Sequence, residues 1–148
     1  MPLPNIILPQ WFAAIGSRLP ALPPRFVLVK TLNTMLERGL LPADMSLFDG
    51  RTFEIDVLDA GIHVRFTADG ERFSDKQFDG TPDLRLAANG VDFLRMMLRE
   101  EDPDTLFFNR KLQIEGDTEL GLITKNLLDS VEWPFAARLE KWRAGNYA

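Results

Sequence analysis

The chain has 148 residues, a formal net charge of −5 at pH 7 and no cysteine. This length is enough for one domain with a substantial core. The missing cysteine excludes disulfides, thiolate nucleophiles and cysteine metal sites, and the mild acidity argues against a broad nucleic-acid surface, which would need a basic stripe.

A proline-rich arm occupies residues 1–24. Pro2, Pro4 and Pro9 interrupt its early apolar residues, and the first positive side chain is Arg18, so a secretory signal is not expected. The chain also lacks an uninterrupted apolar run of bilayer-spanning length, so we expect a cytoplasmic protein that contacts a membrane only at its surface. The arm's apolar side chains could pack on this domain, pack on a second subunit, or anchor in a membrane interface.

A first helix is expected at residues 24–38. Proline suits the first helical position, and Gly39 suits the residue that ends a helix, because glycine adopts a positive φ without strain. One face of this helix is apolar and would pack on the core; it carries Leu28, Val29, Leu32, Met35 and Leu36.

Strands buried on one face are expected next. Apolar and polar residues alternate over residues 53–57 and 62–66, which is typical of such strands. Gly61 and Gly70 lie in turn-forming segments and would supply the positive φ that hairpin turns require. A further strand is predicted at residues 84–88.

A helix predicted at residues 91–99 has more apolar surface than a helix covering one sheet needs. A stripe of roughly 100° is sufficient for that purpose, whereas apolar residues cover more than half of this helix. The surplus must be buried by other helices, a subunit partner or a ligand. The flexible side chains of Met96 and Met97 would adapt to ligands of variable shape.

The stretch over residues 101–133 is predicted to form a strand, a sharp cap and a helix. The strand-forming residues, which precede Gly116, are Leu106, Phe107, Phe108, Leu112 and Ile114. Asp117 would cap the helix, and Glu119 adds negative charge where the helix dipole favours it. The apolar stripe of the helix consists of Leu120, Ile123, Leu127, Leu128 and Val131. This strand and helix together could wall off apolar space.

Two polar residues of the last predicted helix need separate treatment. Thr124 lies within the apolar stripe, and its hydroxyl can bond to the carbonyl one turn back, so it need not contact a ligand. Lys125 lies on the opposite arc and is not assigned to a cavity.

An amphipathic helix and tail are expected at residues 134–148. Phe135, Leu139 and Trp142 recur at helical spacing beside basic residues. This helix could pack on the domain, cover a cavity, touch anionic lipid or bind a partner.

Groups suited to catalysis or metal binding are not evident. His63, the only histidine, lies at the polar parity of its strand, and no serine has a nucleophile-elbow context. The acidic run Glu100, Glu101, Asp102 and Asp104 lacks the ligand spacing and central glycine of a calcium loop, so we interpret it as a solvated loop between helix and strand. No catalytic residue, metal or cofactor is therefore predicted.

Three motifs near the end of the chain, DPDTLFF, IEGDTELGL and KNLLDSVEW, resemble the end of a sterol carrier protein type 2 (SCP-2) domain. They are similar in particular to the bacterial lipid-binding accessory factors of oxygen-independent ubiquinone biosynthesis. Weaker matches precede them in the same order: FDGRTFEIDVLDAGIHVRF, TADG and DLRLAANGVDFLRMML. The resemblance covers most of the chain, over residues 25–133.

The resemblance implies an α+β, SCP-2-like fold, with a mainly antiparallel sheet of about five strands covered by helices around an apolar cavity. Residues 25–133 would form this lipid-binding domain, between the N-terminal arm and the C-terminal amphipathic helix. We expect the cavity between the sheet and the helices that follow Gly90 and Asp117. The residues expected to line it are Phe66, Phe93, Met96, Met97, Phe107, Leu120, Ile123 and Leu127.

The implied function is that of a lipid-binding accessory protein rather than an enzyme. It would hold an isoprenoid quinone precursor or a phospholipid for ubiquinone-biosynthesis enzymes, with transient contact at the inner membrane and no nucleic-acid partner. A homodimer is left open. The alternative is an adaptor with a closed core, which recruits proteins through apolar patches on the arm and the helix around Trp142.

Overall fold

The structure, a computed structural model, describes residues 24–133. The arm predicted at residues 1–24, apart from its last residue, and the helix predicted at residues 134–148 lie outside this range. The helices are α2 (Pro24–Glu37), α3 (Gly90–Met97), α4 (Pro103–Phe108) and α5 (Thr118–Ser130), with short 3-10 helices η1 (Met45–Phe48) and η2 (Leu58–Ala60). The strands are β1 (Thr52–Val57), β2 (Ile62–Ala68), β3 (Phe73–Ser74), β4 (Leu84–Ala88) and β5 (Leu112–Gly116).

The strands form one five-stranded sheet in the order β3-β2-β1-β4-β5. Strand β1 pairs antiparallel with β2, with Ile55 opposite Val64, and parallel with β4, where Ile55 meets Leu86. The pairs β2–β3 and β4–β5 are antiparallel. The predicted α+β fold with a mainly antiparallel sheet is therefore confirmed, with one parallel pair at its centre.

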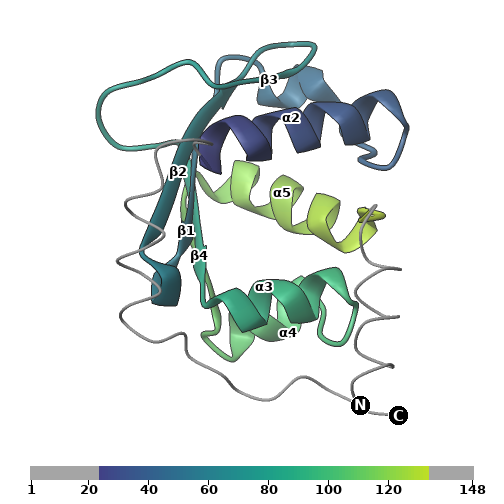
Figure 1. The fold of residues 1–148 in the computed structure, drawn as a ribbon, viewed down its shortest axis with the longest axis vertical. Coiled ribbons are helices and arrows are strands. Elements are labelled where there is room, and N and C mark those ends of the chain that lie inside the picture. The colour runs from purple at the N-terminus through teal and green to yellow at the C-terminus, as the bar shows by residue number, and fades with distance from the viewer. Residues whose placement is uncertain (1–23, 134–148) are drawn as a thin grey trace.

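Helices α2, α3, α4 and α5 cover the same face of the sheet (Figure 1). The reason is the alternation within the strands, because every second side chain points to the same face. Phe53, Phe66, Leu84 and Leu86 are buried on the helix side, whereas the opposite face carries charged residues. The core consequently lies on one side of the sheet.

Helix α2 agrees with the helix predicted at residues 24–38. Gly39 has a φ of 72°, and the N–H of Leu40 donates to the carbonyl of Met35 at 2.9 Å, which ends the helix. Asn33 fixes the helix to β3, because its side chain accepts from the N–H of Phe73 at 2.8 Å and donates to the Phe73 carbonyl at 2.9 Å.

The predicted strand over residues 106–108 is wrong, since these residues belong to α4. The side chain of Asp102 accepts a hydrogen bond from the N–H of Thr105 at 2.6 Å, and Pro103 occupies the first turn. A capped N-terminus with proline therefore outweighs the strand preference of Phe107 and Phe108. The acidic run that was interpreted as a loop between a helix and a strand therefore leads into a helix: Asp102 caps α4, and Asp104 lies in its first turn.

The two predicted hairpin turns differ from each other. Gly61 has a φ of 64°, as expected. Gly70 does not adopt a positive φ, so that prediction is wrong. The carboxylate of Asp69 forms the turn instead by accepting the N–H groups of Glu71 and Arg72, each at 2.8 Å.

The core has two clusters. The larger one lies between the sheet, α2 and α5, and includes Met35, Phe48 and Leu120. The smaller one joins α3 and α4 to the ends of β4 and β5; its buried members are Ala88, Met96, Leu106 and Leu112, with Phe93 packed against them. Other elements of the fold thus bury part of the apolar surplus predicted for α3.

Replacing Gly116 by alanine is expected to destabilise this fold strongly. Its φ of 123° suits only glycine, and an added Cβ would collide with the backbone carbonyl of Asp83. We expect Gly116→Ala to lower the free energy of unfolding in urea by about 3 kcal/mol or more. Gly39→Ala is the matched control, because a Cβ there meets no atom within 4 Å, and it should cost about 1 kcal/mol. Equal losses would contradict this explanation.

Candidate functional site

An apolar cavity of about 70 Å³ lies inside the larger core cluster, and we call it the inner cavity. The sheet contributes Phe53, Phe66, Leu84 and Leu86, helix α2 contributes Leu32, and α5 contributes Thr124, Leu127 and Leu128. The rings of Phe53 and Phe66 stack with their centroids 5.3 Å apart. The cavity therefore has an aromatic floor on the sheet and a helical roof.

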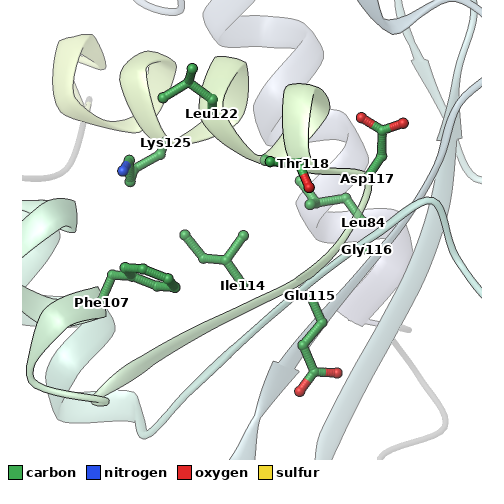
Figure 2. Close-up of a pocket in the computed structure, with 10 residues that line it drawn as sticks. Leu84, Phe107, Ile114, Glu115, Gly116, Asp117, Thr118, Leu122 and Lys125 are labelled. Atoms are coloured by element: carbon green, nitrogen blue, oxygen red, sulfur yellow. The ribbon is translucent and has the colours of Figure 1, made fainter.

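A second and larger space, the outer pocket, has a volume of about 390 Å³ (Figure 2). It lies between α4, the edge strand β5 and α5. Leu84 lines both the outer pocket and the inner cavity, so this side chain belongs to the wall between them. Gly121 lets α5 approach this wall closely, because a Cβ there would lie 3.3 Å from the Cγ2 of Ile114 and 3.5 Å from the Cδ1 of Leu84.

Exposed apolar side chains surround one end of the outer pocket. Phe107 and Leu122 line it and are 40% and 54% exposed, and the neighbouring Phe108 is 79% exposed. Lys125 lies across from Phe107, with its Nζ 2.6 Å from Asp104 and 5.6 Å from the centre of the Phe107 ring (Figure 2). Within residues 24–133, no helix has the length and apolar character to cross a bilayer.

The structure divides the residues predicted to line a cavity into three groups. Phe66 and Leu127 line the inner cavity, and Phe107 lines the outer pocket. Leu120 and Ile123 belong to the larger core cluster without lining either space. Helix α3 lines neither space. Of its three predicted residues, Phe93 and Met96 belong to the smaller cluster, and Met97 is half-buried.

Several lining residues were not selected from the sequence. Strand alternation placed Phe53 on the buried face but gave no reason to choose it over its neighbours. Leu84 borders both spaces only because β4 lies in the middle of the sheet, between β1 and β5. Lys125, which was not assigned to a cavity, borders the outer pocket.

The hydroxyl of Thr124 is bonded differently from the threonine hydroxyls of α2. Thr31 and Thr34 of α2 each donate to the carbonyl one turn back, at 2.7 and 2.8 Å. Thr124 is 8% exposed, and its Oγ1 has no hydrogen-bond partner among the described residues. The bond to the preceding turn, which the sequence allows, is not formed, and a buried hydroxyl stays unpaired among the described residues beside the inner cavity.

A charged network occupies the face of the sheet opposite the helices. Asp56, whose side chain is 2% exposed, lies 2.9 Å from the Nδ1 of His63 and 2.6 Å from the Nε of Arg85. Glu54 pairs with Arg65 at 3.1 Å and with Arg85 at 3.5 Å. Since neighbouring strands bring these residues into register, the network extends across β1, β2 and β4.

The network shifts the titration of its two carboxylates in opposite directions. Burial alone would raise the pKa of Asp56, but hydrogen bonds from His63 and Arg85 outweigh burial and lower it. Burial and the adjacent Asp56 raise the pKa of Glu54.

Glu54, Asp56 and His63 present oxygen and nitrogen atoms within 4.8 Å of one another, a spacing suited to a metal ion. The guanidinium group of Arg85 already lies against both carboxylates, and that of Arg65 lies against Glu54. A cation would have to displace them, so the network favours a structural role.

Comparisons with known proteins agree with this architecture. The model of the SCP-2 sterol transfer family matches residues 32–129. The ubiquinone biosynthesis accessory factor UbiT of Escherichia coli (strain K12) is 36% identical over 108 residues, which cover 73% of this chain and 62% of that protein.

Two solved structures are similar at the level of the fold. The UbiJ-SCP2 ubiquinone synthesis protein has a TM-score of 0.53 at 14% identity, over 70% of this chain and 94% of that one. The sec-alkylsulfatase Pisa1 from Pseudomonas sp. has a TM-score of 0.50 at 19% identity, over 74% of this chain and 17% of that one.

Replacing Asp56 by asparagine should destabilise the protein in a pH-dependent way. We expect Asp56→Asn to lower the free energy of unfolding at neutral pH by about 2–3 kcal/mol, because Arg85 and His63 lose their charged acceptor. The lowered pKa of Asp56 means that its contribution is complete above the ordinary aspartate pKa, about 3.9, and is lost as pH falls through the folded-state value.

Denaturant unfolding at several pH values measures this effect. The difference between the wild type and Asp56→Asn should shrink toward acid. Asp75→Asn, at an exposed position, is the control and should be neutral throughout. A difference that does not change with pH would contradict the assigned role of the network.

Proposed function

Since the chain belongs to the SCP-2 sterol transfer family, we propose that it is a lipid-binding accessory protein of ubiquinone biosynthesis. Its cargo would be an isoprenoid quinone precursor or a phospholipid, held for the enzymes of the oxygen-independent pathway. The observation that carries the proposal is the apolar inner cavity beneath α5, separated from the outer pocket by the side chain of Leu84. The match to a ubiquinone biosynthesis accessory factor supports the choice of pathway.

The two spaces together suit a chain-like apolar ligand. The outer pocket, about 390 Å³, has the size of a small-molecule site, whereas the inner cavity of about 70 Å³ holds only a short segment. A ligand would therefore occupy both by moving Leu84, and each buried methylene would contribute about 0.8 kcal/mol. Among the predicted residues, Phe66, Phe107 and Leu127 would contact it, and Leu120 and Ile123 would support α5 from the core.

The arrangement of polar groups supports a carrier rather than an enzyme. His63 and the buried Asp56 lie on the sheet face opposite the helices, away from both apolar spaces. A ligand in those spaces would meet mostly carbon atoms. The adaptor alternative depends on the arm and on the helix around Trp142, which lie outside the described residues.

We also propose a transient contact with the inner membrane from the cytoplasmic side, through an aromatic tip formed by Phe107, Phe108, Arg110 and Lys111. Phe108 is largely exposed at the end of α4, beside the outer pocket. Aromatic rings are favoured at the headgroup level of a bilayer, and each nearby basic residue adds about 1 kcal/mol of attraction to an anionic surface. A lipid leaving the bilayer at this tip would be adjacent to the pocket.

The cavity assignment predicts that filling the inner cavity prevents lipid loading. The protein is incubated with vesicles that contain phospholipid and a polyprenylphenol, reisolated and extracted, and the lipids are identified by mass spectrometry. The wild type should carry stoichiometric lipid. Leu127→Trp should carry little, because the indole occupies the cavity that Leu127 lines.

Overpacking costs about 1–3 kcal/mol, so circular dichroism must show that Leu127→Trp is folded. Leu58→Trp is the control, since Leu58 is 43% exposed and lines neither space. A clean extract from the wild type, or equal loading of all three proteins, would refute lipid binding in this cavity.

The aromatic tip predicts weaker membrane binding for Phe108→Asp. The substitution removes a ring that would lie in the membrane interface and adds a negative charge, so it should reduce sedimentation with anionic vesicles by about tenfold or more. Leu47→Asp is the control, because Leu47 is 51% exposed in η1, distant in sequence from α4, and should bind vesicles like the wild type. If both variants bind equally well, the tip is not the contact surface.

A further inference from the structure

The inner cavity has one unusual polar neighbour, the hydroxyl of Thr124. Its Oγ1 is buried without a partner, although other threonines in this chain show that a helix offers an acceptor one turn back. Burying a hydroxyl without a hydrogen bond costs free energy that a valine of the same shape would avoid. A threonine at this position is therefore explained if a bound ligand supplies the hydrogen-bond partner of its hydroxyl.

The surroundings of Thr124 restrict what that partner is. The surface of the inner cavity is apolar. Glu54 also borders it, but its carboxylate pairs with Arg65 and Arg85 on the opposite face of the sheet. A charged group placed in the cavity would meet no opposite charge, which is strongly unfavourable. A neutral oxygen, as in a phenol or a quinone carbonyl, could exchange one hydrogen bond with Thr124.

The position of Thr124 along α5 gives the direction of entry. Gly121 lies one turn earlier on the same face of the helix and lines the outer pocket. Leu84, which lies close to Gly121, lines both that pocket and the cavity that Thr124 lines. Threonine in a helix populates two χ1 rotamers, so its hydroxyl has more than one position in which it can meet a partner.

We propose that Thr124 binds the polar end of the cargo, so that the oxygen-bearing edge of a neutral ring enters the inner cavity first and the isoprenoid tail lies in the outer pocket. This inference rests on the proposed lipid-binding function and narrows it. It selects a prenylated phenol or quinone over a phospholipid, whose phosphate could not enter the apolar cavity. It also makes the tail, rather than the ring, the part nearest to Phe107.

The test compares two probes that differ in one oxygen. Farnesylphenol and farnesylbenzene are titrated into the wild type, Thr124→Val and Thr124→Ser, and dissociation constants are measured by calorimetry. Thr124→Val should weaken farnesylphenol about five- to tenfold and leave farnesylbenzene nearly unchanged, because it removes only the hydrogen bond. Thr124→Ser keeps the hydroxyl and should stay within about threefold of the wild type for the phenol.

Thr124→Val should fold at least as stably as the wild type, since it removes an unpaired buried hydroxyl. If Thr124→Val weakens the binding of farnesylphenol and farnesylbenzene equally, or does not weaken the binding of farnesylphenol, the inference is overturned while lipid binding stands. Farnesyl phosphate binding as tightly as the phenol would overturn the ring-first orientation. If the wild type binds none of the three probes and also takes up no phospholipid from vesicles, the proposed function itself is refuted.

Discussion

The fold depends on a junction at which hydrogen bonds join three strands and helix α5. The Asp83 carboxylate accepts from the N–H of Thr52 at 2.9 Å, and the Thr52 hydroxyl accepts from the N–H of Asp83 at 2.8 Å. The N–H of Asp117 donates to the Asp83 carbonyl at 2.9 Å, an approach that the φ of Gly116 permits. Arg51 lies 3.2 Å from the Asp117 carboxylate. The start of β1, the start of β4 and the turn from β5 into α5 are thereby fixed to one another.

The position of α5 follows from this junction, and the two apolar spaces follow from the position of α5. The helix lies between α2 and the pair α3 and α4 (Figure 1). Leu128 of α5 packs against both core clusters. Gly121 brings the first turns close to β4 and β5, whereas farther along the helix Leu127 and Thr124 leave the inner cavity against the sheet. One helix therefore forms the roof of the cavity and one side of the outer pocket.

Local patterns in the sequence were sufficient for most elements and insufficient for their pairing. Helix α2, strands β1, β2 and β4, and the Asp117 cap of α5 follow from periodicity and end signals. The strand predicted at residues 106–108 is wrong because the cap at Asp102, rather than the strand propensity of these residues, decides the local structure. The parallel pairing of β1 with β4 depends on contacts far apart in the sequence, which alternation does not encode.

The same limit explains why the candidate site was only partly predictable. Helix α3 does have a surplus of apolar residues, but α4 buries part of it. Because the residues of α4 were predicted to form a strand, the sequence did not indicate this helix–helix contact. Parity along a strand tells which face a side chain occupies, not which neighbour it meets, so Leu84 could not be identified as the residue common to both spaces.

The two faces of the sheet also differ in how their polar groups are satisfied, and this difference gives Thr124 its significance. On the face opposite the helices, Asp56 is nearly inaccessible, yet His63 and Arg85 of the two neighbouring strands lie within hydrogen-bond distance of its carboxylate, so its burial is compensated within the chain. On the helix face, Thr124 is buried to a similar degree without a partner, beside a cavity with an apolar surface. A neutral ligand in the inner cavity would supply the hydrogen-bond partner that the Thr124 hydroxyl lacks among the described residues.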